Sequence, residues 1–303
     1  MEVDVLIPVY RPDGKLTELL KRLKMQNYPI HRVILMNTEE KHFPTELTGI
    51  WDRVEVYHLA KEEFDHGGTR DRGVRMSTAD LVVCMTQDAM PADETLIEEL
   101  VKPFDDPEVW AAYARQLPNE DCREVEKYTR SFNYPEQSMV KTKEDLDRLG
   151  IKTFFCSNVC AAYRREIYEE LGGFVKHTIF NEDMIYAAKA VEAGYAIAYA
   201  ADARVIHSHN YTNVQQFQRN FDLGVSQAEH PEVFAAYPSE SEGKRMVKDV
   251  TAYLRDNHMS GKLPHFYIQC ACKYAGYLLG KNYRRLPGKW VLAFTSNKEY
   301  WKQ

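Results

Sequence analysis

Leu81-Val82-Val83-Cys84-Met85 is a wholly apolar run, and Thr86-Gln87-Asp88 follows it directly. An apolar run of this length, bounded by polar residues, predicts a strand that is buried on both faces. Strands of this kind are typical of parallel sheets that helices cover on both sides. The run therefore indicates an α/β fold, with polar side chains placed where the strand ends.

Similar apolar runs precede and follow this one. Helical patterns alternate with them, such as Leu16 to Leu23, whose leucines fall on one face of a helix. The alternation predicts a doubly wound, mostly parallel sheet with helices on both faces. The runs that we predict as strands are Val3–Pro8, Arg32–Met36, Val54–Leu59, Leu81–Met85 and Val109–Ala114.

Polar residues follow three of these predicted strands. They are Tyr10-Arg11, Asn37-Thr38-Glu39 and Thr86-Gln87-Asp88. Sheets of this type bind ligands in the crevice beyond the carboxyl ends of their strands. We therefore expect these three groups to lie around one ligand site.

A glycine pair stands in the segment Phe64-Asp65-His66-Gly67-Gly68-Thr69-Arg70. Glycines allow the backbone to approach a diphosphate closely, and a helix that begins there adds N–H donors. Arg70 is suited to a bidentate contact with phosphate. We predict that Gly67, Gly68 and Arg70 bind a diphosphate. The alternative is a glycine turn followed by a helix capped by Asp and Arg side chains.

The acidic pair Glu182-Asp183 follows a Gly-Gly-Phe turn at residues 172–174. Small and apolar residues at helical spacing run from Met184 to Ala193 and end at Gly194. The pair is therefore predicted to open a helix, where free N–H groups favour carboxylates. That preference by itself accounts for two acidic residues, and the alternative is a catalytic role.

The order of these motifs resembles family 2 of the inverting glycosyltransferases, which have the GT-A fold. The resemblance covers residue 1 to about residue 235. It implies transfer of a sugar from a nucleotide diphosphate donor to a hydroxyl, with inversion. It also implies that Asp183 is the catalytic base and that Glu182 assists it.

The same resemblance assigns the residues at the strand ends to the donor. Pro8, Tyr10 and Arg11 stand where the family holds the nucleotide base. Asn37 or Glu39 then contacts the edge of the base, although the usual Asp-rich motif is missing at this point. Two further segments, Phe64–Gly73 and Arg115–Pro118, resemble the bacterial rhamnosyltransferases of the family. The resemblance therefore implies dTDP-L-rhamnose as the donor and a lipid-linked precursor of a cell-surface polysaccharide as the acceptor.

GT-A enzymes usually have Asp-x-Asp after the fourth strand, where it holds a divalent cation on the diphosphate. Here Thr86 replaces the first Asp, so that only Asp88 remains, next to Gln87. Hard cations prefer several oxygen ligands. We expect Mg²⁺ or Mn²⁺ to bind weakly through Asp88, with His207 or His209 as a further ligand.

Five residues are expected to line the sugar or the acceptor. For two of them, Gln116 and Asn158, a buried polar network of purely structural function is the alternative. Processive members of the family carry Gln-x-x-Arg-Trp, but here Asn220 follows Arg219, which argues against a processive synthase. The five residues are Arg115, Gln116, Asn158, Asn181 and Arg219.

The 303 residues suffice for one large α/β domain and an appendage. We expect residues 1–238 to form the GT-A domain and residues 239–303 a basic, aromatic-rich helical extension. No stretch reaches the roughly 18 apolar residues of a membrane-spanning helix. The first residues do not resemble a signal peptide, and the six cysteines lack metal-binding spacing. We expect a cytoplasmic protein.

Charge is distributed unevenly along the chain. Residues 241–303 contain 12 Lys and Arg against 4 Asp and Glu, a net charge of +8, whereas the remainder has −14. We expect the basic extension to hold the protein on the anionic inner face of the cytoplasmic membrane. The alternative is that its aromatic residues pack on the catalytic domain or form a homo-oligomer interface. Nucleic acid is not an expected partner.

Two other functions compete with glycosyl transfer. A sugar-phosphate nucleotidyltransferase also has a Gly-rich segment followed by Thr-Arg, but places it directly after the first strand. A non-catalytic relative that binds sugar is the other alternative, favoured by the incomplete Asp-x-Asp and opposed by Asp88 and Asp183.

Overall fold

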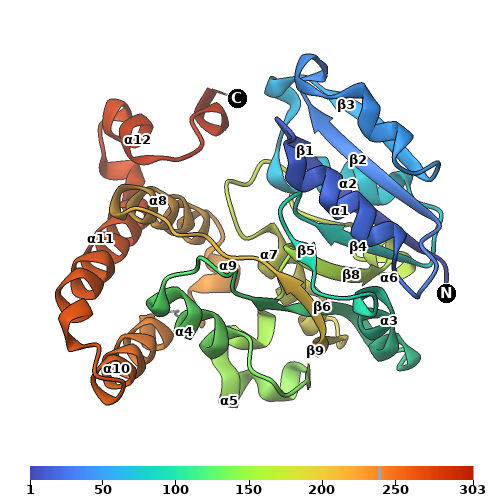
Figure 1. Cartoon of the computed structure of the whole chain (residues 1–303). Helices are drawn as coiled ribbons and strands as arrows, with labels where there is room; N and C mark the ends of the chain where they lie inside the picture. Colours follow the sequence, from blue (N-terminus) through green and yellow to red (C-terminus); the bar gives the residue numbers. More distant parts are fainter. Residues whose placement is uncertain (238–239, 303) are drawn as a thin grey trace. The chain divides into compact units, whose positions relative to one another are not determined.

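The computed structural model of the chain describes residues 1–237 and 240–302 (Figure 1). It consists of two compact units, each of which is described by itself. The first unit comprises residues 1–119, 134–177 and 182–208, and the second comprises residues 120–133, 178–181 and the described residues from 209 on. The domain boundary predicted at residues 238 and 239 lies outside the described residues.

A sheet of nine strands, counted over the described residues, forms the centre of the first unit. Its order is β3-β2-β1-β4-β8-β6-β9-β5, and β7 pairs with β9. The strands are β1 (Val3–Tyr10), β2 (Arg32–Thr38), β3 (Val54–Leu59), β4 (Leu81–Met85), β5 (Met90–Pro91), β6 (Val109–Leu117), β7 (Met139–Lys141), β8 (Cys160–Arg164) and β9 (Ala196–Ile206).

The predicted mostly parallel sheet is confirmed, and four of its strands, β5, β7, β8 and β9, are not among the five apolar runs that were predicted as strands. β1 pairs in parallel with β2 and β4, β2 pairs in parallel with β3, and β6 pairs in parallel with β9. β8 runs antiparallel to both of its neighbours, β4 and β6. Its first residue, Cys160, pairs with Met85 at the end of β4. The loop before β8 therefore lies at the carboxyl edge of the parallel strands.

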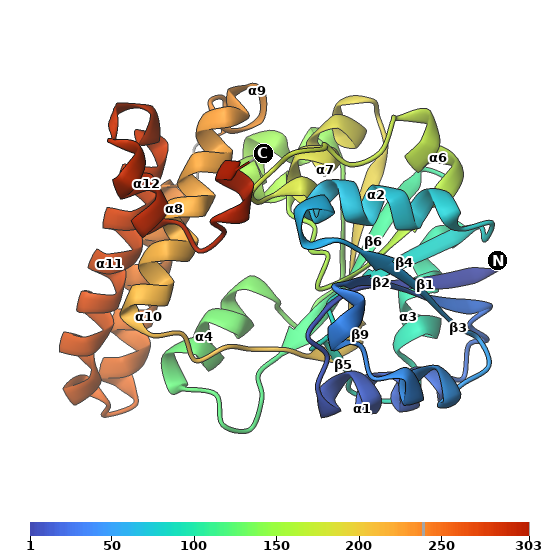
Figure 2. The ribbon, with the colours of Figure 1, turned by 90° about the horizontal axis from the view of Figure 1, so that it is seen from above.

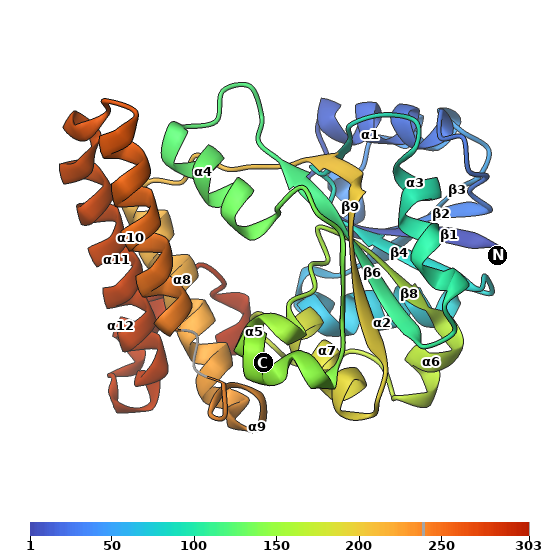
Figure 3. The same ribbon diagram turned by 90° about the horizontal axis from the view of Figure 1, so that it is seen from below.

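Helices cover both faces of this sheet, as predicted (Figures 2 and 3). One face carries α1 and α3, and the other carries α2, α6 and α7 (Figure 2). The helices of the first unit are α1 (Gly14–Lys24), α2 (His66–Met76), α3 (Leu96–Val101), α5 (Leu146–Leu149), α6 (Arg165–Glu170) and α7 (Glu182–Glu192).

The two faces of the sheet have cores of different composition. The face under α1 and α3 is aliphatic and buries residues such as Leu19, Leu100 and Val83. The face under α6 and α7 is aromatic: Trp110 lies 5.2 Å from Tyr163 and 4.9 Å from Tyr186, measured between ring centroids. Edge-to-face contacts of this kind fix the relative positions of the rings more tightly than aliphatic packing does. The aromatic core therefore gives α7 a well-defined position.

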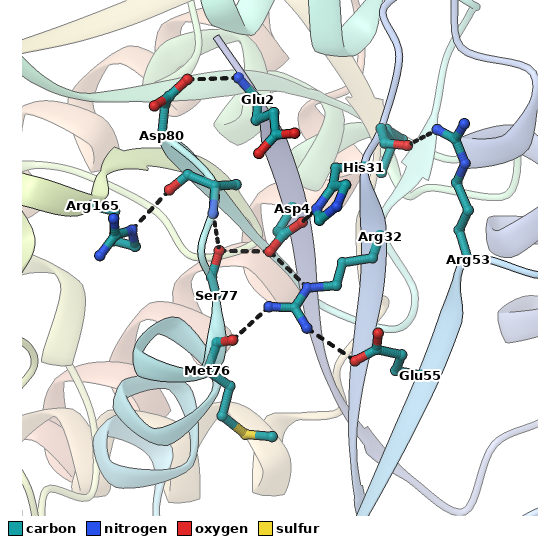
Figure 4. A network of polar contacts seen from close by, with 12 residues as sticks. Glu2, Asp4, His31, Arg32, Arg53, Glu55, Met76, Ser77, Asp80 and Arg165 are labelled. Carbon is teal, nitrogen blue, oxygen red and sulfur yellow. Dashed lines mark hydrogen bonds and ion pairs between the residues drawn. The ribbon is translucent and has the colours of Figure 1, made fainter.

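A buried ionic network lies at the start of β1 (Figure 4). The Asp4 side chain has no exposed surface. Its carboxylate accepts from Arg32 Nε at 3.0 Å and from Ser77 Oγ at 2.6 Å, and it lies 2.9 Å from His31 Nδ1. Arg32 also pairs with Glu55 at 3.1 Å. The network ties β1, β2 and β3 to the end of α2 at the amino edge of the parallel strands.

The second unit is helical, and the helical character predicted for the C-terminal extension is confirmed by α10, α11 and α12. Its helices are α4 (Glu124–Asn133), α8 (Asn213–Glu229), α9 (Pro231–Phe234), α10 (Glu240–Asp256), α11 (Leu263–Lys281) and α12 (Gly288–Phe294). Glycines let α8 and α11 pack backbone against backbone. A Cβ at Gly276 would overlap the carbonyl oxygen of Phe217, and one at Gly280 would overlap that of Phe221. This contact groups α8 with the C-terminal helices rather than with the sheet.

Most aromatic residues near the C-terminus are part of a core. Val291 and Tyr300 pack with Phe221 and Val225 of α8, and Phe294 and Trp301 are partly buried against them. This packing is the alternative that the sequence had left beside membrane contact. Within the described part of the chain, every helix is too short or too polar to traverse a bilayer.

Candidate active site

The acidic pair begins α7, as predicted, and its two carboxylates have different surroundings. Glu182 is buried, and its carboxylate lies 3.0 Å from Arg70 NH1 and accepts from Asn158 Nδ2 at 3.1 Å. Burial opposes ionisation of Glu182, but the charge of Arg70, together with His66 and the bond from Asn158, outweighs it and lowers the pKa. Glu182 is therefore an ionised carboxylate that is already neutralised inside the protein.

Asp183 is half-buried and is bonded by backbone groups only. Its Oδ2 accepts from Asn158 N at 3.0 Å, and its Oδ1 accepts from Met184 N at 2.8 Å. Burial, followed by the negative charge of Glu182, raises the pKa of Asp183 to about 7. Of the pair, Asp183 is the carboxylate able to take up a proton near neutral pH.

The side chain of Arg70 and the backbone at Gly67 and Gly68 contact other groups of the protein and do not line an open phosphate-binding loop. Arg70 is buried and pairs with Glu182, and its guanidinium also donates to the His66 carbonyl at 3.0 Å. A Cβ at Gly67 would overlap the carbonyl oxygen of Val175, and the N–H of Gly68 donates to Asp65, which caps α2. The structure thus gives this segment the role of supporting the acidic pair, which the sequence had not indicated.

A second cluster lies at the end of β4. Asp88 Oδ1 and His207 Nε2 are 3.6 Å apart, and His207 is nearly buried whereas Asp88 is partly exposed. The other ring nitrogen of His207, Nδ1, lies 3.1 Å from Gln116 Oε1. A carboxylate oxygen and an imidazole nitrogen that face the same point are able to bind one divalent cation. The pairing of Asp88 with His207 supports the predicted metal site.

Gln116 holds this cluster in place. Its Nε2 donates to Tyr134 Oη at 2.5 Å and to Ser157 Oγ at 3.0 Å, so that its oxygen is directed at His207. This contact suits the tautomer of His207 with the proton on Nδ1, whose Nε2 lone pair could bind a cation together with Asp88. Metal-binding histidines are commonly oriented in this way by an acceptor on the distal nitrogen. Gln116, expected to line a sugar, is buried and contacts the proposed metal ligand instead.

The dipeptide Ser157-Asn158 joins the two clusters. Ser157 accepts from Gln116, while Asn158 donates to both carboxylates of the acidic pair. The Asn158 oxygen in turn accepts from Tyr163 Oη at 2.8 Å. All polar atoms of the buried Asn158 side chain are thereby used within the protein. These contacts fix the acidic pair and match the structural alternative, while the expected contact with sugar hydroxyls stays a prediction.

The residues expected to bind the donor lie where the parallel strands end. Tyr10 is exposed, and Arg11 stacks over its ring at 5.1 Å. Gln87 exchanges two hydrogen bonds with the backbone of Tyr10, at 3.0 and 3.1 Å, and so connects β1 to the loop after β4. Pro8 is a partly buried residue of β1.

The strand-end residues of β2 are engaged with neighbours. Asn37 is fully buried, with its Nδ2 2.9 Å from His58 Nδ1. Glu39 pairs with Lys41 at 2.7 Å, and this bond, above all other causes, lowers the pKa of Glu39. Of the residues expected to line the sugar, Arg115 pairs with the exposed Glu136 at 3.0 Å.

Three of the expected site residues belong to the second unit. Asn181 is buried and donates to Ser226 Oγ at 3.1 Å. Arg219 lies 4.8 Å from the ring centroid of Tyr211 and 5.4 Å from that of Phe180. His209, the alternative metal ligand, follows His207 by two positions in the sequence and stacks on Tyr211 at 4.9 Å.

The second unit also contains a cavity of about 460 Å³. Residues 122–126 at the start of α4, residues 209–211, and the start of α11 line it. Its two glutamates are paired, Glu124 with Lys127 and Glu126 with Arg130, each at 3.0 Å. Its Arg123 and Lys262 side chains make no ion pair with any described residue, so the cavity has an excess of positive charge. Sequence reasoning gave no sign of it, since its wall comes from three separate segments.

Comparison of the sequence with known proteins gives consistent matches. A model described as glycosyl transferase family 2 matches residues 4–172. The O-antigen chain rhamnosyltransferase RfbN of Salmonella typhimurium strain LT2 is 38% identical over 303 residues, which cover 99% of this chain and 96% of that protein. The O-antigen chain rhamnosyltransferase WbaN of Salmonella anatum is 42% identical over 245 residues, covering 80% of this chain and 78% of that protein.

Solved structures that are similar to this chain include two glycosyl-transfer proteins. The mannosyltransferase PcManGT from Pyrobaculum calidifontis, solved with GDP-Man and Mn²⁺, has a TM-score of 0.57 at 18% identity, covering 96% of this chain and 78% of that one. TarS of S. aureus, as a crystallised fragment, also has a TM-score of 0.57, at 14% identity, covering 94% of this chain and 92% of that one. At these identities the likeness concerns the fold, and it confirms the predicted GT-A type.

Proposed function

Because this chain belongs to glycosyl transferase family 2, we propose that it is an inverting rhamnosyltransferase of cell-surface polysaccharide synthesis. Its donor is dTDP-L-rhamnose, and its acceptor is a hydroxyl of a lipid-linked saccharide precursor. The near full-length similarity to two O-antigen chain rhamnosyltransferases supports the sugar. A nucleotidyltransferase or a non-catalytic sugar-binding protein would explain neither this similarity nor an acidic pair with one carboxylate left unneutralised.

The reaction is a single displacement at the anomeric carbon of the donor. The acceptor oxygen forms the new bond to this carbon from the face opposite the leaving group. The bond from the anomeric carbon to the diphosphate oxygen breaks, and the nucleotide diphosphate leaves with the electron pair. The proton of the acceptor hydroxyl passes to Asp183. One inversion results because only one displacement takes place.

The raised pKa of Asp183 supports its role as the base. A carboxylate of ordinary pKa is a weak proton acceptor at neutral pH, whereas one with a pKa of about 7 is both substantially ionised and more basic. Glu182 maintains this raised pKa through its negative charge, and Arg70 keeps Glu182 ionised. Arg70 therefore acts on the reaction through Glu182 and is a positioning residue rather than a diphosphate ligand.

Asp88 and His207 are the proposed protein ligands of a divalent cation, Mg²⁺ or Mn²⁺. His209, the other histidine expected from the sequence, belongs to the second unit and stays a prediction as a ligand. When bound, such a cation offsets the negative charge that develops on the leaving diphosphate. Two or three protein ligands leave positions open for phosphate oxygens and water, which is typical of weakly bound Mg²⁺ sites.

The second unit has a cavity of its own that we propose as a binding site for the phosphate groups of the lipid-linked saccharide. Its cavity has the unpaired cations Arg123 and Lys262, which suit the phosphate groups of a lipid-linked saccharide. Such an acceptor is embedded in the membrane, so we place the protein at the inner face of the cytoplasmic membrane as a peripheral protein. Variants of Arg123 and Lys262 should raise the KM for the acceptor and leave that for the donor unchanged.

A transfer assay tests the proposal. Purified protein is incubated with dTDP-L-rhamnose labelled in the sugar, a polyprenyl diphosphate-linked saccharide and Mg²⁺ or Mn²⁺. We expect label in the lipid-linked product, a product linkage of inverted anomeric configuration, and loss of transfer after EDTA treatment. Equal transfer from UDP-glucose or GDP-mannose would contradict the assignment of the donor. Retention of configuration would contradict the single displacement.

A further inference from the structure

The outward side of α11 is an apolar surface that takes no part in the reaction proposed for the first unit. Four of its large residues are exposed: Tyr267 by 43%, Ile268 by 55%, Tyr274 by 57% and Leu278 by 42%. Tyr267, Tyr274 and Leu278 recur at intervals of seven and four, so they lie in one stripe along the helix. The smaller exposed residues Pro264, Ala271 and Ala275 fall on the same side. No charged residue interrupts this stripe between Pro264 and Leu278.

The opposite side of α11 is the one that packs inside the unit. Gly276 and Gly280 contact α8, and Phe266 packs in a cluster with Val250 and Leu254 of α10. The helix therefore packs against α8 and α10 without using the residues of the stripe. Two further exposed apolar side chains, Trp290 at 49% and Leu292 at 41%, stand on the following helix, α12.

The charges of the sequence segment that contains the stripe have a single sign. Residues 257–298 contain seven Lys and Arg residues and not one Asp or Glu. Most of them are exposed, among them Lys262 before α11 and Arg284, Arg285 and Lys289 between α11 and the first turn of α12. A partner of this surface must therefore be both apolar and anionic.

We propose that the outer stripe of α11 is the surface that lies in the headgroup region of an anionic lipid bilayer. This inference deepens the proposed function, because it identifies the surface that would hold the protein where a lipid-linked acceptor is found. An exposed apolar stripe with aromatic residues, flanked along the chain by Lys and Arg, is the pattern of helices that lie in the membrane interface. α11 is a candidate for lying in the plane of the interface, since no described helix meets the requirements of a spanning one.

A second copy of the chain suits this surface less well. In a symmetric dimer the same patch would face itself, which would bring the cations of residues 257–298 together without any acidic side chain from that segment to balance them. An anionic leaflet supplies the missing negative charge, and each basic residue near it adds to the attraction.

The surface differs from the one expected from the sequence. Residues 281–303 had been expected to contact the membrane, but Phe294, Tyr300 and Trp301 of that segment contribute to a core with α8. Removal of residues 281–303 would expose this core and would not give a clean test. Point substitutions on the outer stripe avoid that problem because the replaced side chains are already exposed.

Vesicle flotation of the full chain tests the proposal without donor, acceptor or metal. The vesicles contain phosphatidylcholine alone or phosphatidylcholine mixed with phosphatidylglycerol, at low and at high salt. The test variant is Tyr274→Glu with Leu278→Glu. The matched control is Val214→Glu, which places a new charge on an apolar side chain of α8 that is 67% exposed.

We expect the wild type and Val214→Glu to float with the anionic vesicles and to be released by high salt. Tyr274→Glu with Leu278→Glu should reduce the bound fraction by about tenfold or more. Unchanged flotation of this variant, or equal binding to both kinds of vesicle, would overturn the proposal. A dimer in light scattering that the variant dissociates, together with absence of vesicle binding, would assign the stripe to a second copy instead. A failure of rhamnosyl transfer alone would leave the flotation result unaffected.

Discussion

Two carboxylate groups of the first unit, a buried one and a half-buried one at opposite edges of one sheet, differ in how their charge is balanced. Asp4, at the start of β1, has a guanidinium, a hydroxyl and an imidazole around it (Figure 4). Asp183, at the carboxyl edge, is bonded by two backbone N–H groups, and the nearby guanidinium of Arg70 is paired with Glu182 instead. The charge of Asp4 is neutralised by Arg32. Asp183 is held in place by backbone N–H groups, and the nearest cation, Arg70, is paired with Glu182.

This difference separates structural from catalytic use of the same functional group. A buried carboxylate that is paired with Arg is costly to disturb but has little tendency to exchange a proton. A carboxylate beside another negative charge is held less favourably in its ionised form, and its pKa rises toward the range in which a base is useful. The acidic pair contains both cases, since Arg70 neutralises Glu182 and leaves Asp183 without a cation of its own.

The largest effect is expected from Asp183→Asn. Removal of the base should lower the rate of transfer by roughly 10²–10⁴-fold. Binding of dTDP-L-rhamnose should stay close to that of the wild type, because Asp183 is not assigned to the donor. Single-turnover transfer and donor titration measure the two quantities. If the folded variant turns over at a near-normal rate, the base must be sought elsewhere, first at Glu182.

Asp4→Asn should act on stability and leave catalysis intact. The substitution leaves the largely buried Arg32 without its buried counter-charge, so the free energy of unfolding should fall by about 3 kcal/mol. Glu55→Gln is the matched control, because the Glu55 side chain is 42% exposed and its pair with Arg32 should contribute less than about 1 kcal/mol. Urea denaturation and specific activity are the measurements. A loss of specific activity in folded Asp4→Asn would contradict the assignment of a structural role to Asp4 and a catalytic role to Asp183.

Gln116 provides a third comparison, between a proposed metal ligand and the residue that orients it. Gln116→Leu should weaken Mn²⁺ binding by about tenfold, since His207 loses the acceptor on its Nδ1. Gln116→Glu should retain affinity because a carboxylate can accept the same hydrogen bond. Titration of Mn²⁺ followed by electron paramagnetic resonance measures the affinity independently of activity. Equal affinities of the Leu variant and the wild type would remove Gln116 from the metal site.

Local patterns were sufficient to predict five strands of the sheet and the start of α7. The run at Leu81–Met85 matches β4 residue for residue, because a strand that is buried on both faces has a wholly apolar sequence. The run at Val54–Leu59 likewise matches β3, although Glu55 and His58 stand within it and only its first and last residues are buried. The helix predicted from the acidic pair onward is likewise present as α7. β8 could not be predicted as an antiparallel strand, because Cys160–Arg164 contains small and polar residues and its pairing depends on distant neighbours.

Pairings between distant segments account for what the sequence left open in the site. The sequence alone predicts Arg70 as a phosphate ligand, but in the fold Arg70 lies 3.0 Å from Glu182 and forms an ion pair with it. Ser157, which links the two clusters, carries no signal of its own, and the role of Gln116 depends on contacts with Tyr134, Ser157 and His207. The family resemblance placed Asp88, His207 and Asp183 as candidates, whereas their supporting residues follow only from the three-dimensional arrangement.

The pH dependence of kcat/KM in the wild type and in Glu182→Gln tests the central claim, that Asp183 is a base whose pKa is raised by its burial and by the negative charge of Glu182. A base must be deprotonated, so kcat/KM of the wild type should fall as the pH drops through about 7. Glu182→Gln removes the neighbouring negative charge and frees Arg70, so the same limb should move to lower pH by about one unit. A wild-type profile that is flat across the neutral range, or a limb that stays in place in Glu182→Gln, would contradict the account.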